Sequence, residues 1–294
     1  MNRGRIESLG ENLNEIAGIN SGWAGSNFAS AADYKAVVGR PVGEMYGYVT
    51  DGFYTADDFE GFDAATNLWI PKSGLLPSGT AVGQVAQPGV IKLKDLNEDG
   101  TVNDLDQKVI GNANPKVTGG LNQQFTYKNF DASVFLNFVL GNDVYNANKI
   151  EFTTNTPNTV FSNVLDVMED RYRTINADGT RITDLNTLRE VNQNAKIWTP
   201  TQRYFLHSWA VENGSFLRIN NVTLGYSLPK PLIQRVKMTQ VRFYVTLNNL
   251  YTFTKYTGYD PEVNTRRSSP LTPGVDYAAY PRSRAFLLGV NLAL

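Results

Sequence analysis

The sequence predicts an all-β fold, namely a segment of an antiparallel transmembrane β-barrel with long extracellular loops. Three observations lead to this fold class. Apolar and polar residues alternate along segments of about ten residues, short and long connections follow one another between these segments, and aromatic residues are frequent where charged residues are scarce. Aromatic residues make up 12% of the 294 residues and charged residues 19%, whereas soluble domains carry about 25% charged residues.

Two strands are expected near the start of the chain, at about residues 3–13 and 19–30. Both ranges hold few apolar residues, such as Ile6 and Leu9 in the first and Trp23 in the second. The alternation is therefore weaker here than anywhere else in the predicted sheet.

A hairpin is expected from two clear strands at 117–127 and 130–140. Only Lys128 and Asn129 separate them, which is the length of a tight antiparallel turn, and Asn tolerates the positive φ that such turns need. One face of the second strand carries Phe130, Ala132, Val134, Leu136, Phe138 and Leu140.

The next strand, at 215–228, changes phase partway along. Its apolar residues are Leu217 and Ile219 in one phase and Val222, Leu224, Tyr226 and Leu228 in the other. A β-bulge near Asn220 and Asn221, or a change of environment there, would explain the switch.

The last two strands are expected at 240–253 and 284–294. The first has apolar residues at Val241, Phe243, Val245, Leu247, Tyr251 and Phe253, and the second at Phe286, Leu288, Val290, Leu292 and Leu294. Each set shares one face of its strand, because side chains alternate across a strand.

The connections alternate in length. Long outer loops are expected at 31–116, 141–213 and 254–283, and short links at 128–129 and about 230–239. Periodicity alone fits a soluble β-sandwich equally well. Structureless connections of about 70 residues are improbable in a compact sandwich but ordinary as outer loops of a large barrel, which favours the barrel.

Composition narrows the functional classes. The net charge of −1 provides no basic field that would attract nucleic acid, so no nucleic-acid partner is expected. The chain has no Cys and no uninterrupted apolar run of about 18 residues, so neither disulfides nor a membrane helix is expected. The short basic patches TRR at 265–267 and PRSR at 281–284 are expected to contact solvent or lipid headgroups.

The segment DLNEDGTVNDLD, at 95–106, has the spacing of a calcium-binding loop. Calcium needs about six to eight hard oxygen ligands, and Gly100 at loop position 6 permits the sharp turn that gathers them. A bare solvated turn is the alternative, because clusters of Asp, Asn and Gly are common in turns. The predicted ligands of this structural calcium site are Asp95, Asn97, Asp99, the Thr101 carbonyl, Asn103 through water, and Asp106.

No enzymatic activity is expected. His207 is the only histidine, so neither a His-based zinc site nor a Ser-His-Asp triad with further histidines can be assembled. The carboxylate pairs at 57–58, 169–170 and 260/262 are adjacent in sequence, which does not place two carboxyl groups across a cleft as glycosidases require.

Five stretches resemble the SusC/RagA family of TonB-linked outer-membrane transporters. They are GRPVGEMYGYVTDGFY at 39–54, PGVIKLKDLNEDGTVNDLDQKVIGNANPKVTGGL at 88–121, VENGSFLRINNVTLGYSLP at 211–229, NLYTFTKYTGYDPEVN at 249–264 and YPRSRAFLLGVNLAL at 280–294. Their order and spacing are similar to those of the carboxy-terminal barrel strands of the family.

The resemblance implies a barrel of about 22 strands in the bacterial outer membrane, of which this chain would supply about seven. It also implies a plug domain, absent from this sequence, through which the TonB complex would act, and a SusD-like surface lipoprotein that captures glycans or peptides. Outer-membrane lipid would surround the strands. The alternative is a soluble secreted β-module that binds calcium and carbohydrate.

Overall fold

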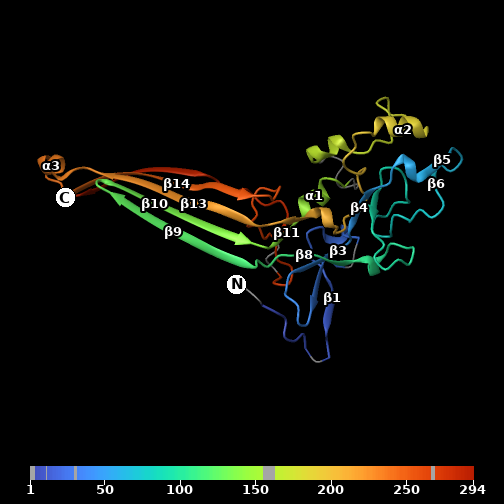
Figure 1. The fold of residues 1–294 in the computed structure, drawn as a ribbon, viewed down its shortest axis with the longest axis horizontal. Helices are drawn as coiled ribbons and strands as arrows, with labels where there is room; N and C mark the ends of the chain where they lie inside the picture. Colours follow the sequence, from blue (N-terminus) through green and yellow to red (C-terminus); the bar gives the residue numbers. More distant parts are fainter. Residues whose placement is uncertain (1–3, 11, 30–31, 155–162, 266–268) are drawn as a thin grey trace.

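The computed structural model describes residues 4–10, 12–29, 32–154, 163–265 and 269–294. The chain forms two parts, a long sheet and a compact unit at one end of it (Figure 1). We call the second part the loop unit; it comprises the described residues within 4–116, 141–215 and 255–284. No helix among the described residues is long and apolar enough to cross a membrane.

The long sheet is antiparallel, with the strand order β16-β14-β13-β10-β9. Each of its five strands coincides with a strand range expected from the sequence, although seven strands were expected in this sheet. The strands are β9 (Val117–Tyr127), β10 (Phe130–Leu140), β13 (Phe216–Ser227), β14 (Gln240–Thr254) and β16 (Ala285–Ala293).

Pairing between the strands sorts the side chains into two faces. On the face that we call apolar, one row across four strands is Ala132, Leu224, Val245 and Leu288, and the next is Phe130, Tyr226, Phe243 and Val290. On the face that we call polar, Ser133, Thr223 and Thr246 lie in one row. Leu288 is 83% exposed and Phe286 is 72% exposed, so the described residues do not cover the apolar face.

A bulge explains the phase change in β13. Phe135 pairs with Asn221 but Leu136 pairs with Ile219, which leaves Asn220 as an extra residue. The register with β14 shifts at the same place, where Asn249 adopts a left-handed φ of 52°. The predicted bulge is confirmed, and it keeps both halves of β13 apolar on the same face.

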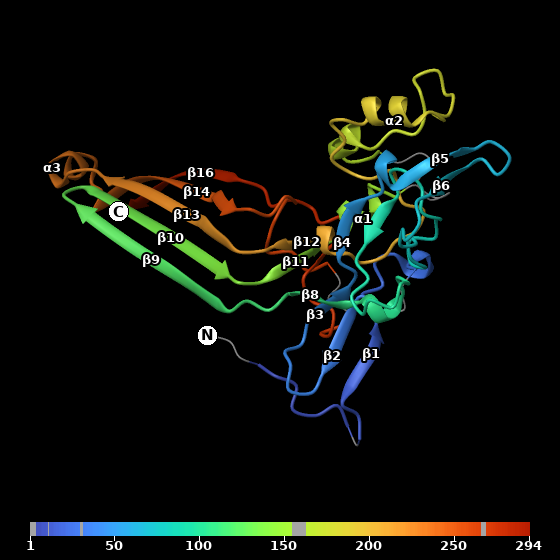
Figure 2. The same cartoon turned by 45° about the vertical axis from the view of Figure 1, so that its right-hand side comes forward.

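The short turns lie at the end of the long sheet far from the loop unit (Figures 1 and 2). In the β9–β10 turn Lys128, with φ 53°, takes the left-handed conformation that was expected of Asn129. The β13–β14 connection contains the short helix α3 (Lys230–Ile233) and a 3-10 turn (Gln234–Val236).

The long connections are folded, which corrects the expectation of structureless loops. Together with β1, which precedes them in the chain, their strands form a four-stranded sheet β1-β2-β3-β8, a three-stranded sheet β12-β11-β15 and the pairs β4-β7 and β5-β6. The strands are β1 (Glu15–Ile19), β2 (Tyr34–Val37), β3 (Glu44–Gly47), β4 (Thr50–Phe53), β5 (Phe59–Asp63), β6 (Leu68–Pro71), β7 (Ile91–Leu93), β8 (Lys108–Asn112), β11 (Asp143–Asn146), β12 (Val211–Asn213) and β15 (Val275–Asp276), and the helices are α1 (Ala147–Glu151) and α2 (Leu185–Val191).

Two apolar clusters hold the loop unit together. One gathers 18 buried residues, among them Tyr54, Trp69 and Phe205. The other joins segments far apart in sequence, because Trp23 Nε1 donates to the Tyr145 hydroxyl over 2.5 Å. Burial of the apolar side chains in both clusters stabilises the loop unit through the hydrophobic effect.

The strands expected at 3–13 and 19–30 are wrong over the described residues of those ranges. Residues 4–10 are irregular, although Ile6 N–H donates to the Arg40 carbonyl at 2.9 Å. The nearby strand is β1, and Gly25–Asn27 form a 3-10 turn. The apolar residues of these ranges are buried by tertiary packing rather than on one face of an alternating strand. Residues 3, 11, 30 and 31 lie outside the described residues.

We expect Gly289→Val to destabilise the long sheet. A Cβ at Gly289 would overlap the Tyr244 ring, which lies across it from the paired strand, and such overpacking costs about 1–3 kcal/mol. Urea unfolding followed by far-ultraviolet circular dichroism, which reports on the strands, measures the loss. Gly61→Val is the control, because no neighbouring atom lies within 4 Å of its Cβ position. Equal midpoints for the two variants would contradict this packing.

Candidate functional site

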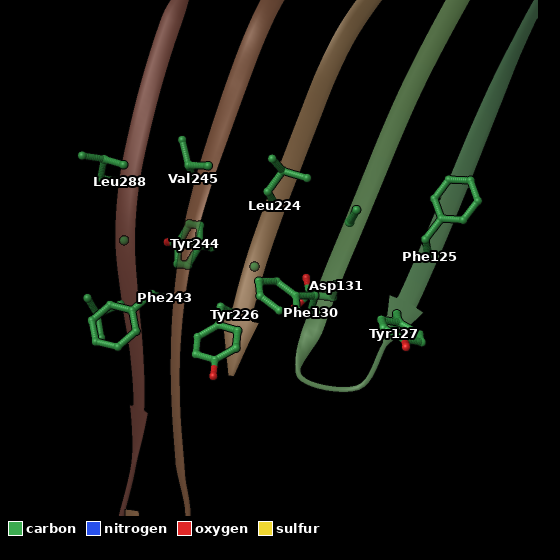
Figure 3. Close-up of a pocket in the computed structure, with 14 residues that line it drawn as sticks. Phe125, Tyr127, Phe130, Asp131, Leu224, Tyr226, Phe243, Tyr244, Val245 and Leu288 are labelled. Atoms are coloured by element: carbon green, nitrogen blue, oxygen red, sulfur yellow. The ribbon is translucent and has the colours of Figure 1, made fainter. Parts of the chain in front are cut away.

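The apolar face has a shallow depression of about 800 Å³ near the β9–β10 turn. Figure 3 shows Phe125, Leu224, Val245 and Leu288 across the strands, with an aromatic row nearer the turn. This row is Tyr127, Phe130, Tyr226 and Phe243. The lining is almost wholly apolar, so the depression suits hydrocarbon rather than a polar ligand.

The polar face is linked by side-chain hydrogen bonds between neighbouring strands. Thr223 and Thr246 hydroxyls are 2.9 Å apart, and Asn221 Nδ2 donates to Asn248 Oδ1 at 2.7 Å. An ion pair crosses three strands, because Arg242 on β14 reaches Asp131 on β10 at 2.5 Å. These bonds satisfy polar groups without placing any of them on the apolar face.

An ion cluster lies at the end of the polar face next to the loop unit. Arg218 on β13 is 3% exposed, and its Nη2 donates to Asp260 Oδ1 at 2.5 Å and its Nη1 to Glu262 Oε2 at 2.9 Å. Its Nε donates to Thr252 Oγ1 at 3.0 Å. Arg282 contacts both carboxylates at 3.0 Å. We call these four charged residues the arginine–carboxylate cluster.

The cluster corrects one expectation from the sequence. Arg282 pairs with carboxylates rather than only with solvent or headgroups, and Asp260 is one of its partners and is buried. Arg266 and Arg267 lie outside the described residues. A single Arg inside the apolar strand segment FLRIN was the available signal, because a charge there needs a partner.

The other carboxylate pairs bind within the loop unit. Asp57 pairs with Arg189 at 2.7 Å, and Asp170 pairs with Lys196 at 2.7 Å. Asp58 accepts from the Thr55 N–H in a capping box. Each of these carboxylates is therefore occupied by a structural contact.

His207 is a buried structural residue of the loop unit. Its ring is parallel to Trp209 with centroids 6.2 Å apart, and its Nδ1 lies 3.0 Å from the Thr50 hydroxyl. Burial, and next the charge of Lys149, lowers the pKa of His207 from its usual value to about 3. The imidazole is therefore neutral at pH 7.

The predicted calcium loop is held by its own hydrogen bonds. Asp95 accepts from Gly100 N–H at 2.8 Å, and Asp99 accepts from the Thr101 N–H and hydroxyl at 2.8 and 2.6 Å. The Thr101 hydroxyl, followed by its N–H, lowers the pKa of Asp99. Asn97 and Asp99 are exposed, and Asn97 Nδ2 donates to Asp99 Oδ2 at 2.9 Å, whereas Asp95 is half-buried.

Asp106, at the twelfth loop position, is fully buried. One of its oxygens accepts from Leu96 N–H at 2.7 Å and the other from Asn103 N–H at 2.8 Å. Its carboxylate thus caps the 3-10 turn Asp104–Asp106. Within the described residues, no group of three or more His, Asp or Glu side chains is arranged to hold a metal ion.

Known proteins resemble this chain over most of its length. The TonB-dependent receptor P3 of Formosa agariphila is 30% identical over 259 residues, which cover 86% of this chain and 22% of that receptor. The TonB-dependent receptor SusC of Bacteroides thetaiotaomicron is 30% identical over 199 residues, covering 67% of this chain and 17% of SusC. The chain therefore spans about a fifth of the length of these relatives. It matches no family model.

Solved structures share the fold. The RagAB peptide importer in the open-open state matches with a TM-score of 0.59 at 21% identity, over 99% of this chain and 25% of that chain. The structure of the RagAB peptide transporter matches with a TM-score of 0.60 at 20% identity, over 99% of this chain and 26% of that chain.

We expect Arg218→Gln to cost about 3 kcal/mol of unfolding free energy, because it leaves the buried Asp260 carboxylate with one arginine fewer. Urea unfolding measures the cost. Lys196→Gln is the control, since its ion pair with Asp170 is exposed and such pairs contribute less than about 1 kcal/mol. A loss for Arg218→Gln no larger than that of the control would show that the cluster is not stabilising.

We expect His207 to make the fold sensitive to acid. The unfolded chain protonates this histidine near pH 6.5 whereas the folded chain does so near pH 3, so its contribution is lost as pH falls through that window. Between pH 7 and 4, wild type should lose up to about 3 kcal/mol more than His207→Phe. Burial also raises the pKa of Asp33 to about 6. Asp33 is present in both proteins, so its effect on stability cancels from the comparison. Parallel curves of unfolding free energy against pH for the two proteins would contradict the lowered pKa of His207.

Proposed function

Because the chain belongs to the SusC/RagA family of TonB-dependent receptors, we propose that it forms the carboxy-terminal part of the barrel wall of a nutrient transporter in the bacterial outer membrane. The observation that carries this proposal is the long sheet, whose strands keep apolar residues on one face and polar residues on the other. Barrel strands alternate in this way between lipid and lumen.

In this arrangement the apolar face contacts outer-membrane lipid and the polar face lines the lumen. The aromatic row beside the β9–β10 turn lies where a membrane interface requires amphipathic rings. The alternative of a soluble secreted β-module would leave Phe286 and Leu288 in water, so the exposed face favours the membrane. We propose no catalytic activity, since the relatives are receptors.

We propose that the whole receptor imports glycans or peptides together with a SusD-like surface lipoprotein, and that the TonB complex drives it through a plug domain. A relative named SusC supports the family context, and the RagAB peptide importer and the RagAB peptide transporter, which share the fold, support the peptide alternative. The loop unit, at the end opposite the short turns (Figure 1), would face the outside and meet the lipoprotein.

We also propose that calcium binds weakly at residues 95–106. Asp95, Asn97 and Asp99 would provide side-chain oxygens, with the Thr101 carbonyl, Asn103 through water, and Asp106 as the remaining positions. The loop spacing supports this proposal, whereas the buried Asp106 carboxylate is already bonded to backbone N–H groups. Calcium would brace the loop unit and take no part in transport.

We expect Leu121→Arg to impair membrane assembly where Asn122→Arg does not. Both residues are exposed at the centre of β9, on opposite faces, and an Arg facing lipid at the bilayer midplane costs about 2–4 kcal/mol. Unfolding of the full-length receptor in lipid vesicles gives the difference, and outer-membrane fractionation gives the yield. A soluble sheet would tolerate both variants equally, which would contradict the barrel.

We expect calcium to raise thermal stability by about 1.4 kcal/mol at ten times its dissociation constant, which should be roughly 10⁻⁴ to 10⁻³ M for so few carboxylates. Melting with calcium and with chelator measures the shift. Asp99→Ala should abolish it. Asp178→Ala should retain it, because Thr180 donates to Asp178 as Thr101 does to Asp99 but outside the loop spacing. Without a calcium shift, the segment is only a turn.

A further inference from the structure

A cavity of about 840 Å³ lies in the loop unit where it meets the long sheet. Its walls come from α1 and Phe152, the segment 165–167, Trp209, and the two segments 257–259 and 278–281. Figure 2 shows α1 beside this junction. A volume of this size is ordinary for a ligand site, for which about 300–1,000 Å³ is typical.

The cavity adjoins the polar face of the long sheet. Tyr259 lines it and also lines a smaller cavity of about 220 Å³ around Arg218. Asp260 and Arg282 follow Tyr259 and Pro281 directly in the chain, so the arginine–carboxylate cluster fixes both wall segments. A ligand in the cavity would therefore lie at the outer end of the lumen face.

Two charged residues line the cavity: Lys149, which is paired, and Asp166, an exposed carboxylate that accepts from the Val167 N–H at 2.8 Å. Lys149 lies 3.5 Å from Glu212, and both side chains are largely buried. Lys149 Nζ also lies 3.9 Å from the centre of the Trp209 ring. An anionic ligand would therefore have to break the Lys149–Glu212 ion pair, and a sugar ring would have to displace the ammonium group to stack on that face of Trp209.

The amide side chains that line the cavity are also occupied. Asn146 Nδ2 donates to Glu212 at 2.9 Å, and Asn148 bonds both the Asp276 carbonyl at 3.3 Å and the Ala278 N–H at 2.9 Å. A glycan carries several hydroxyls that each need a partner, and leaving them unpaired is costly. The remaining lining is mainly apolar, as at Phe152, Leu165 and Val167.

We propose that this cavity binds the apolar side chains of an incoming peptide. Phe152, Leu165 and Val167 form the apolar lining. Tyr259 and Tyr280 are 78% and 91% exposed, so their rings are available to cover a bound aromatic or aliphatic group, as rigid aromatic anchors do at interfaces. The proposal deepens the proposed import function and rests on it, because it takes the polar face as the lumen.

Binding to the purified full-length receptor in detergent tests the proposal. The probes are acetyl-Ala-Phe-Phe-Ala-amide, the matching serine peptide and maltotriose, measured by calorimetry. The phenylalanine peptide should bind at least tenfold tighter than the other two. The double variant Tyr259→Ala and Tyr280→Ala should weaken it about tenfold or more. Val85→Ala is the control, because this residue is exposed in the loop unit and does not line the cavity.

Equal binding of the two peptides, or tyrosine variants without effect, would overturn the cavity proposal. Maltotriose binding that the double variant weakens would also overturn it and would identify a glycan site. Outer-membrane fractionation and TonB-dependent uptake of the same receptor separate this outcome from failure of the proposed function. A receptor that reaches the membrane and transports, yet shows no phenylalanine preference, contradicts only the cavity assignment.

Discussion

Continuous backbone pairing across β9, β10, β13, β14 and β16 forces every side chain of the long sheet onto one of two faces. A one-residue slip would move the apolar set of a strand to the opposite face. The bulge at Asn220 is therefore essential, because it lets Leu217 and Leu224 share the apolar face although their spacing is odd. The left-handed Asn249 restores the register on the neighbouring strand.

The polar face depends on the same pairing and connects the sheet to the loop unit. Arg218 occupies a polar-face position, so its guanidinium meets Asp260 and Glu262 from the connection that follows β14. Arg282, shortly before β16, completes the arginine–carboxylate cluster. The cluster thus fixes both ends of the last long connection to one strand, and with them two walls of the adjoining cavity.

The long sheet was predictable from the sequence because its signal is local. Alternation between Val117 and Leu140 defined both strands and the two-residue turn, although the turn places its positive φ at Lys128. The loop unit was not predictable in this way, because distant contacts define it. Tyr34, for example, donates its hydroxyl to the Pro273 carbonyl, 239 residues away.

The candidate site was only partly visible in the sequence. Its apolar and polar faces follow from the alternation, whereas the partners of Arg218 lie 42 and 44 residues further along the chain and no spacing rule joins them. For the predicted calcium loop the sequence shows the pattern but not how the side chains are used. Its spacing was clear, yet a spacing cannot tell that the Asp106 side chain is buried and accepts from the Leu96 and Asn103 N–H groups.

Site-directed spin labelling along β13 tests the two-faced wall most directly. This chain has no Cys, so single cysteines can be introduced into a Cys-free full-length receptor in lipid vesicles, and accessibility to oxygen in lipid can be compared with that to a water-soluble relaxant. Labels at 217, 219, 222, 224 and 226 should be lipid-accessible, with the phase changing at Asn220. Uniform water accessibility, or odd-numbered alternation that continues unchanged past residue 220, would contradict the account.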